Sequence, residues 1–265
     1  RGRGKNVVID GTTAYVATGT GSIGLEKPGL IIIDISDSVQ PVLIATIDTQ
    51  VPLNAVKING TTAYLSNGSS GLQIFDVSDP SHPVPVGTIN TPGRVLNLVI
   101  DGTIAYVADD SSGLQIIDVT NPAPPVSIGS IDTPNWAQSV VIDGHTAYVA
   151  DYFSGLQIFD VTEPAQPMPI GSIDTPGTAL RVVIDGTTAY VADGEAGLQI
   201  FNVSVSALPV LVGMIDIPGK SVNVVEVDGA RLHMRACLLV VWAMGKRLCV
   251  CLRSMGRGGF RSVGR

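Results

Sequence analysis

Cysteine is absent from most of this chain. Its 265 residues include only Cys237, Cys249 and Cys251, all near the C-terminal end. Disulfides and cysteine-based zinc sites are therefore excluded from residues 1–236. The single Cys-x-Cys at 249–251 provides too few ligands for a structural zinc site, which needs four.

Positive charge is also scarce until the last stretch. Residues 1–227 carry 22 Asp or Glu and 8 Lys or Arg, a net charge of −14, whereas residues 228–265 carry 8 Lys or Arg and one Asp, a net charge of +7. Because phosphate binding needs clustered Lys and Arg, we do not expect nucleic acid as a partner. No apolar run reaches about 18 residues, so we expect no membrane span.

Histidine is too sparse to suggest a catalytic centre. His82, His145 and His233 share no local ligand spacing, and no Ser or Cys nucleophile is visibly paired with one. Residues 19–24 match GxGxxG, but a strand-like sequence follows instead of the helix that pyrophosphate binding requires. We therefore expect a lengthened loop, no enzyme activity and no organic cofactor.

What the chain has in abundance is repetition. The phrase AYVAD…GLQIF recurs, and Tyr64, Tyr106, Tyr148 and Tyr190 are spaced by 42 residues each. Tyr15 precedes Tyr64 by 49 residues because the first unit carries seven extra residues. A fixed period of this size is typical of propellers, solenoids and arrays.

Each unit has the sequence pattern of four short strands. In residues 92–133 the apolar run VLNLVI is followed by an Asp-Gly turn and then by the strand-like TIAYVAD, as in a hairpin. LQIIDV and VSIGSIDT follow, separated by the proline-rich TNPAPP. Four antiparallel strands in about 42 residues predict an all-β fold, a β-propeller of four-stranded blades.

The units resemble LVIVD-type repeats of bacterial and archaeal surface proteins, with YVTN-type propeller repeats as a second match. The resemblance rests on residues 105–109, 113–119, 121–122 and 131–134, and the same columns recur in the units that begin at 50, 134 and 176. It covers about residues 1–229. It implies a β-propeller displayed outside the cytoplasm, on the cell surface or secreted, and it implies no particular chemistry.

We predict five units and the start of a sixth. They span 1–49, 50–91, 92–133, 134–175 and 176–217, and the sixth begins at 218. The chain opens in mid-pattern, so we interpret it as a fragment of a larger propeller. Five units and part of a sixth would form an incomplete propeller with uncovered blade faces, so we expect an adhesive surface.

Residues 230–265 depart from the repeat and form an aberrant basic tail. The sixth unit should continue as TTAYVADG but reads ARLHMRACLLVVWAMG. Codons that encode 231–235 can give Thr-Ala-Tyr-Ala when read two bases later, and the same frame permits Gly-Leu at its usual distance. We therefore predict a shifted reading frame. The alternative is a genuine basic segment.

Repeated acidic residues are expected to cap loops. When the repeats are aligned, Asp109, Asp151 and Asp193 occupy one position, or column, which Asn67 and Thr18 occupy in the other two repeats. All three residue types can accept hydrogen bonds in a turn. We expect a similar structural role for the column of Asp34, Asp76, Asp118, Asp160 and Asn202. A Ca²⁺ ion held by residues 109–112 is the alternative for the first column.

Variable positions in the loops are the candidates for binding. The connection leading into each unit and the loop between the second and third strands should emerge on one face. We expect Trp136, Tyr152 and Phe153 to lie together there, because exposed aromatic side chains beside charges are typical of binding surfaces. The candidate ligand-binding residues are Trp136, Tyr152, Phe153, Arg94, Arg181, Lys220, Asp110 and Glu195. The alternative is that Trp136 fills a channel and that Tyr152 and Phe153 cover a seam.

The function that these observations favour is non-catalytic binding of a protein or a glycan. Two alternatives remain. A complete propeller could be a hydrolase or lyase with Arg94, Arg181 and Lys220 in its channel, or the repeats could be a purely structural spacer. The oligomeric state is not predicted.

Overall fold

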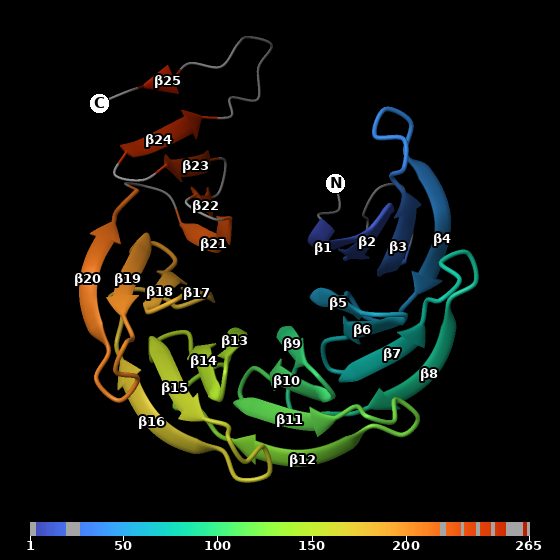
Figure 1. Ribbon diagram of the computed structural model, residues 1–265, viewed down its shortest axis with the longest axis horizontal. Helices are drawn as coiled ribbons and strands as arrows, with labels where there is room; N and C mark the ends of the chain where they lie inside the picture. The colour runs from blue at the N-terminus through green and yellow to red at the C-terminus, as the bar shows by residue number, and fades with distance from the viewer. Residues whose placement is uncertain are drawn as a thin grey trace. The chain divides into compact units, whose positions relative to one another are not determined.

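The repeats fold into separate antiparallel β-sheets. The computed structural model describes residues 4–19, 27–217, 221–228, 231–236, 239–244, 247–252 and 262–263. The described strands form six sheets, in each of which neighbouring strands follow one another in the chain (Figure 1). An all-β, propeller-like fold is therefore confirmed.

The first three sheets contain twelve strands. They are β1 (Gly4–Asp10), β2 (Thr13–Thr18), β3 (Gly29–Asp34), β4 (Val42–Asp48), β5 (Ala55–Asn59), β6 (Thr62–Ser66), β7 (Leu72–Asp76), β8 (Val84–Ile89), β9 (Asn97–Asp101), β10 (Ile104–Ala108), β11 (Leu114–Asp118) and β12 (Val126–Ile131). Each sheet lies within one predicted repeat.

The other three sheets contain thirteen strands. They are β13 (Ser139–Asp143), β14 (Thr146–Ala150), β15 (Leu156–Asp160), β16 (Met168–Ile173), β17 (Arg181–Asp185), β18 (Thr188–Ala192), β19 (Leu198–Asn202), β20 (Val210–Ile215), β21 (Val222–Asp228), β22 (Arg231–Ala236), β23 (Leu239–Met244), β24 (Arg247–Leu252) and β25 (Ser262–Val263). The sixth sheet, β21–β25, includes much of the predicted aberrant tail. Cys237 and the tail's residues 253–261 lie outside the described residues.

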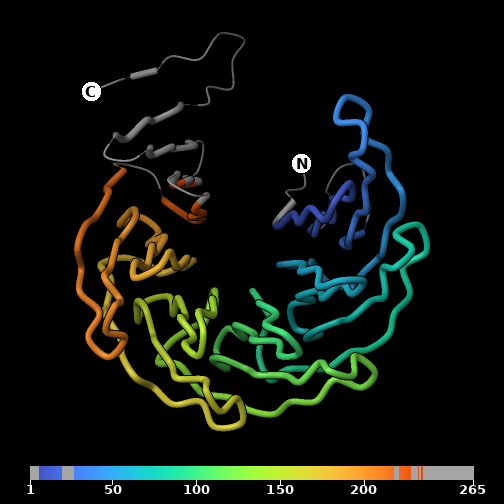
Figure 2. The backbone as a smooth tube through the Cα atoms, in the orientation of Figure 1, coloured from blue at the N-terminus to red at the C-terminus, as the bar shows by residue number. Residues whose placement is uncertain are grey.

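The chain divides into two compact units. One comprises residues 1–132 together with 164–166, and the other comprises 133–163 together with 167–265. The backbone trace follows the consecutive repeats within each unit (Figure 2). None of the described residues forms a helix of the length and hydrophobicity that crossing a bilayer requires.

Tight turns join the first two strands of each repeat. Ile104 pairs with Asp101 across the turn between β9 and β10, where Gly102 has a φ of +56°. A positive φ suits glycine because it has no Cβ, and the Asp-Gly signal in the sequence predicted these hairpins.

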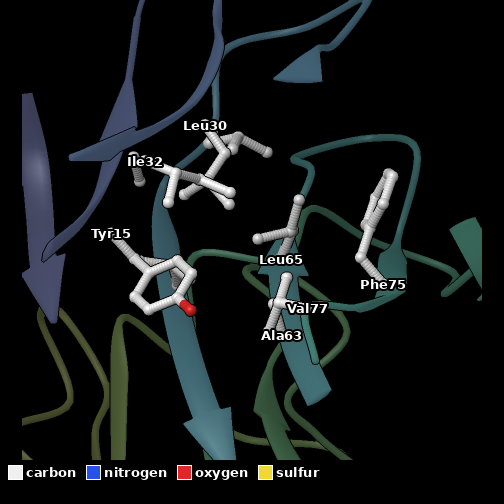
Figure 3. Close-up of a cluster of buried hydrophobic side chains, with 10 residues drawn as sticks. Tyr15, Leu30, Ile32, Ala63, Leu65, Phe75 and Val77 are labelled. Carbon is white, nitrogen blue, oxygen red and sulfur yellow. The ribbon is translucent and has the colours of Figure 1, made fainter. Parts of the chain in front are cut away.

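Apolar side chains on both faces of the sheets form the core. In one cluster, Tyr15, Leu30 and Ile32 of the first sheet pack with Ala63 and Leu65 of the second (Figure 3). In the other unit, Phe201 and Val182 belong to a cluster with Ile158 of the preceding sheet. Burial on both faces explains why the third strands read as nearly continuous apolar runs, since each is covered by neighbouring sheets.

Candidate ligand-binding site

Buried aspartates accept hydrogen bonds from the connection that leads into a repeat. The Asp151 carboxylate, at the end of β14, accepts a hydrogen bond from the Thr133 hydroxyl at 2.6 Å and from the Asn135 backbone N–H at 2.9 Å. Asp109 and Asp193 accept the same pair of bonds, from the threonine that ends the preceding repeat and from the backbone N–H two residues after it. The predicted capping role of this column is therefore confirmed for the three aspartates.

The same aspartates have side-chain pKa values above the ordinary value for aspartate. Burial raises the pKa of Asp109, Asp151 and Asp193, and the hydrogen bonds from threonine and backbone N–H oppose that rise in part. Their oxygens are directed at protein donors. Sequence reasoning missed the threonine partners, although a Thr-Pro pair stands at the corresponding place in three repeats.

The second aspartate column makes exposed turns. The Asp118 carboxylate accepts a bond from the Thr120 N–H at 2.8 Å, and Asp160 accepts one from the Thr162 N–H at 2.9 Å. Hydrogen bonds from the threonine side chain, and next those from its N–H, lower the pKa of both carboxyl groups. The predicted structural role of this column is confirmed as a side-chain turn that closes the end of the third strand.

Three aromatic side chains of the fourth repeat gather beside the Asp151 cap. Trp136 lies in the connection leading into β13, and Tyr152 and Phe153 lie in the β14–β15 loop. The Trp136 and Tyr152 rings stack with centroids 5.0 Å apart, and the Phe153 ring meets Tyr152 edge-on with centroids 4.3 Å apart. The expected proximity of the three side chains is thus observed. Trp136 is 47% exposed and Phe153 is 61% exposed.

The local backbone determines how this aromatic cluster is presented. The Asn135 N–H bond to Asp151 fixes the residue before Trp136. Tyr152 exchanges two backbone hydrogen bonds with Ala179, from the connection leading into the next repeat. Both loops that carry the aromatic rings are therefore held by buried or paired groups, and the rings are presented on an ordered base.

Tyr152 occupies a backbone conformation that favours glycine. Its φ is +49°, and the equivalent positions in the second, third and fifth repeats are Gly68, Asp110 and Gly194, at +52°, +52° and +58°. A side chain in the left-handed region costs about 1–2 kcal/mol. The positive φ belongs to this turn in four of the repeats, and the fourth repeat places an aromatic side chain there despite the strain, which suggests a role for that side chain beyond folding.

Replacing Tyr152 by glycine tests that interpretation. We expect Tyr152→Gly to change the free energy of unfolding by no more than about 1 kcal/mol, because relief of backbone strain offsets the lost ring stacking. Denaturant unfolding of both proteins would measure it. A loss of several kcal/mol would instead identify Tyr152 as a packing residue that covers the seam between sheets.

The other predicted binding residues are spread over the two units. Arg94 is exposed and Asp110 half-buried in the first unit, and Arg181 is half-buried and Glu195 exposed in the second. Burial lowers the pKa of the Arg181 guanidinium, and the nearby Glu226 carboxylate opposes this shift. Lys220 lies outside the described residues. Among the described side chains, ring contacts join only Trp136, Tyr152 and Phe153 of the eight candidates.

Sequence reasoning also missed a polar group beside the aromatic cluster. The Asn135 side-chain oxygen is buried and has no hydrogen-bond partner among the described atoms. The corresponding residues in the third and fifth repeats are Gly93 and Gly177, so the substitution of a glycine column by Asn was the available signal. Within the described residues, no three His, Cys, Asp or Glu side chains gather to hold a metal ion.

Comparison with known protein families identifies the repeats. A family model described as LVIVD repeat matches residues 1–49, 54–91, 92–133, 136–175 and 176–217. These segments cover most of the chain. No curated protein matches the chain.

Solved structures share the fold with little sequence identity. One is a functionally unknown protein from Desulfotomaculum acetoxidans DSM 771, with a TM-score of 0.74 and 16% identity over 97% of this chain and 88% of that one. Another is the computationally designed Ika8 protein, with a TM-score of 0.69 and 6% identity over 88% of this chain and 67% of that one. Both likenesses concern the fold alone.

Proposed function

The chain belongs to the LVIVD-repeat family, and we propose that it is a non-catalytic binding protein that holds a protein or a glycan on the aromatic cluster of Trp136, Tyr152 and Phe153. The observation that carries the proposal is the exposed Trp136 ring stacked on the half-buried Tyr152 ring, whose backbone is strained. A sugar ring or an apolar side chain would lie against Trp136 and Phe153, since aromatic faces provide large contact areas at small entropic cost.

The surroundings of the aromatic cluster support binding more than chemistry. The Asp151 carboxylate lies beneath the cluster and is fully buried, with bonds to Thr133 and Asn135. An acid that is fixed in this way caps a loop and does not face a ligand. The side-chain oxygen of Asn135, next to Trp136 in the chain, has no hydrogen-bond partner among the described atoms.

Trp136 provides the test of this function. The probes are an array of glycans and an array of peptides, followed by titration of the best ligand. We expect Trp136→Ala to weaken binding by about tenfold or more, as for a central aromatic contact. Met168→Ala, which removes a similarly exposed apolar side chain from β16 of the same repeat, is the matched control and should bind as the wild type. Equal affinity of the two variants would contradict the proposed site.

We also propose display outside the cytoplasm. Its support is the cysteine-free, acidic repeat region together with the family resemblance. Proteolysis of intact cells of the source organism would test it: an exposed protein is degraded without lysis, and a protein that is protected until lysis would contradict the proposal.

A further inference from the structure

Two Asn-Gly pairs occur in the second repeat, and the structure places them in opposite environments. Asn59-Gly60 lies at the turn between β5 and β6, and Asn67-Gly68 begins the loop between β6 and β7. The side chain of asparagine is chemically labile. It is most open to attack by the following backbone nitrogen when the next residue is glycine, because glycine has no side chain to obstruct the approach.

The Asn59-Gly60 pair is accessible to water. Asn59 pairs with Thr62 across the turn, which leaves Gly60 outside the strand pairing, and both Asn59 and Gly60 are exposed. None of the described atoms lies within 4 Å of a Cβ placed on Gly60. Within the described part of the chain, no hydrogen bond holds the Gly60 N–H. Water and hydroxide can therefore reach both groups that would react.

One hydrogen bond restrains the Asn59 side chain. Its NH₂ group donates to the Gly102 carbonyl at 3.2 Å, in an exposed position. Gly102 lies in the corresponding turn of the third repeat, between β9 and β10. Because water replaces an exposed hydrogen bond at little cost, this contact does not prevent the rotation that brings the side-chain carbon toward the Gly60 nitrogen.

The Asn67-Gly68 pair is enclosed by the protein. Asn67 is 1% exposed and Gly68 is buried. The Asn67 N–H donates to the Gly71 carbonyl at 2.9 Å, and the Asn67 carbonyl accepts a bond from the Ser70 N–H at 2.9 Å. The Gly68 carbonyl accepts a bond from the Val95 N–H at 3.1 Å. Attack by the Gly68 nitrogen would disrupt this packing, so the same dipeptide is protected here.

We propose that Asn59 is a site of spontaneous deamidation, with water as the co-reactant. Hydroxide removes the proton of the Gly60 backbone nitrogen, and that nitrogen then forms a bond to Cγ of Asn59. The Cγ–Nδ2 bond breaks, and ammonia leaves with a proton from water. Water then opens the resulting five-membered imide at either of its two carbonyl carbons, giving aspartate or isoaspartate. One water is consumed and one ammonia is released, with no oxidation or reduction.

The reaction changes the contact between the turns of the second and third repeats. A carboxylate is an acceptor only, so neither product can donate a hydrogen bond to the Gly102 carbonyl as Asn59 does. Isoaspartate also adds a carbon to the backbone between β5 and β6. The aspartate product gives the second repeat the residue that the other regular repeats have at this position: Asp10, Asp101, Asp143 and Asp185.

The test is mass spectrometry of the purified chain after incubation at mildly alkaline pH, both folded and in denaturing urea. Deamidation replaces NH₂ by OH, and fragment ions assign the resulting mass increase to Asn59 or to Asn67. In the folded chain, Asn59 should react about tenfold faster than Asn67 or more, because Asn67 reacts only in molecules that have opened locally. In urea the two should react at similar rates, since the protection of Asn67 comes from the fold.

Asn59→Gln is the matched control. Its longer side chain would have to close a six-membered ring, which forms more slowly, so the mass at this position should stay constant while Asn67 behaves as in the wild type. Asn59→Asp provides the reference for the aspartate product, and circular dichroism verifies that both variants are folded. The proposal would be overturned if Asn59 reacted no faster than Asn67 in the folded chain. It would also be overturned if Asn59 kept its amide in the folded chain and lost it only in urea.

Discussion

Replacing Gly155 by alanine is expected to lower the free energy of unfolding by about 2–5 kcal/mol. Gly155 opens the third strand of the fourth repeat with a φ of +66°, and an added Cβ would lie 2.3 Å from the Ile173 carbonyl oxygen and 2.7 Å from the Thr175 nitrogen. Backbone strain costs about 1–2 kcal/mol, and overpacking against neighbours that cannot move adds about 1–3 kcal/mol. Denaturant unfolding of Gly155→Ala would measure the loss.

A second variant, Gly144→Ala, separates the cost of backbone strain from the cost of overpacking. Gly144 lies in the β13–β14 turn of the same repeat with a φ of +54°, and none of the described atoms lies within 4 Å of a Cβ placed there. Gly144→Ala therefore introduces the strain alone, and we expect a loss of about 1–2 kcal/mol. If the two variants were equally destabilised, the close approach at Gly155 would have no energetic importance.

Removing the Asp151 carboxylate is expected to cost about 2–4 kcal/mol of folding stability. Asp151→Ala leaves the Thr133 hydroxyl and the Asn135 N–H without their acceptor, and each bond to a charged group contributes about 1.5–3 kcal/mol. The cost of burying the charge offsets part of that loss. Thermal or denaturant unfolding would measure the difference from the wild type.

Asp160→Ala is the matched control, because it removes the same group from an exposed turn of the same repeat. That carboxylate bonds the Thr162 N–H and hydroxyl in solvent, so a much smaller loss is expected. Equal losses at the two positions would show that burial does not decide the importance of these aspartates.

The stability difference between wild type and Asp151→Ala should also depend on pH. Burial raises the pKa of Asp151 in the folded protein above its ordinary value of 3.8. As pH falls from neutrality, the folded state therefore takes up this proton before the unfolded state does, and the wild type gains stability until about pH 4. The alanine variant lacks the group, so the difference should widen over that range. A difference that narrows on acidification would contradict the raised pKa.

The repeated pattern was sufficient to predict most of the fold. Short apolar runs, Asp-Gly turns and proline-rich connections specify strands and their ends through local backbone preferences. The loop-capping role of Asp151 was also predictable, because a column that admits Asp, Asn and Thr selects for a side-chain oxygen. Its threonine partner was not, since Thr133 lies 18 residues away and meets it only after the strands pair.

The aromatic cluster was predictable in part. Repeat alignment placed Trp136 and Tyr152 on neighbouring loops, and the structure shows their rings stacked. The φ of +49° at Tyr152 was not evident, because it arises where the loop pairs with Ala179 of the next repeat. The eight candidate residues also do not form one group, since side-chain direction depends on the strand register and on which sheet lies opposite.

By itself, the sequence determined the repeat, the order of strands and the positions of the turns, because these depend on residues close together in the chain. Only the tertiary structure decided which described side chains of a repeated column are covered. Val212 and Ile170 occupy the same column and are similar side chains, yet Val212 is exposed and Ile170 half-buried. Next to Ile170, the Ser206 carbonyl of the following repeat lies against Gly171, and the composition of the strand itself does not contain this information.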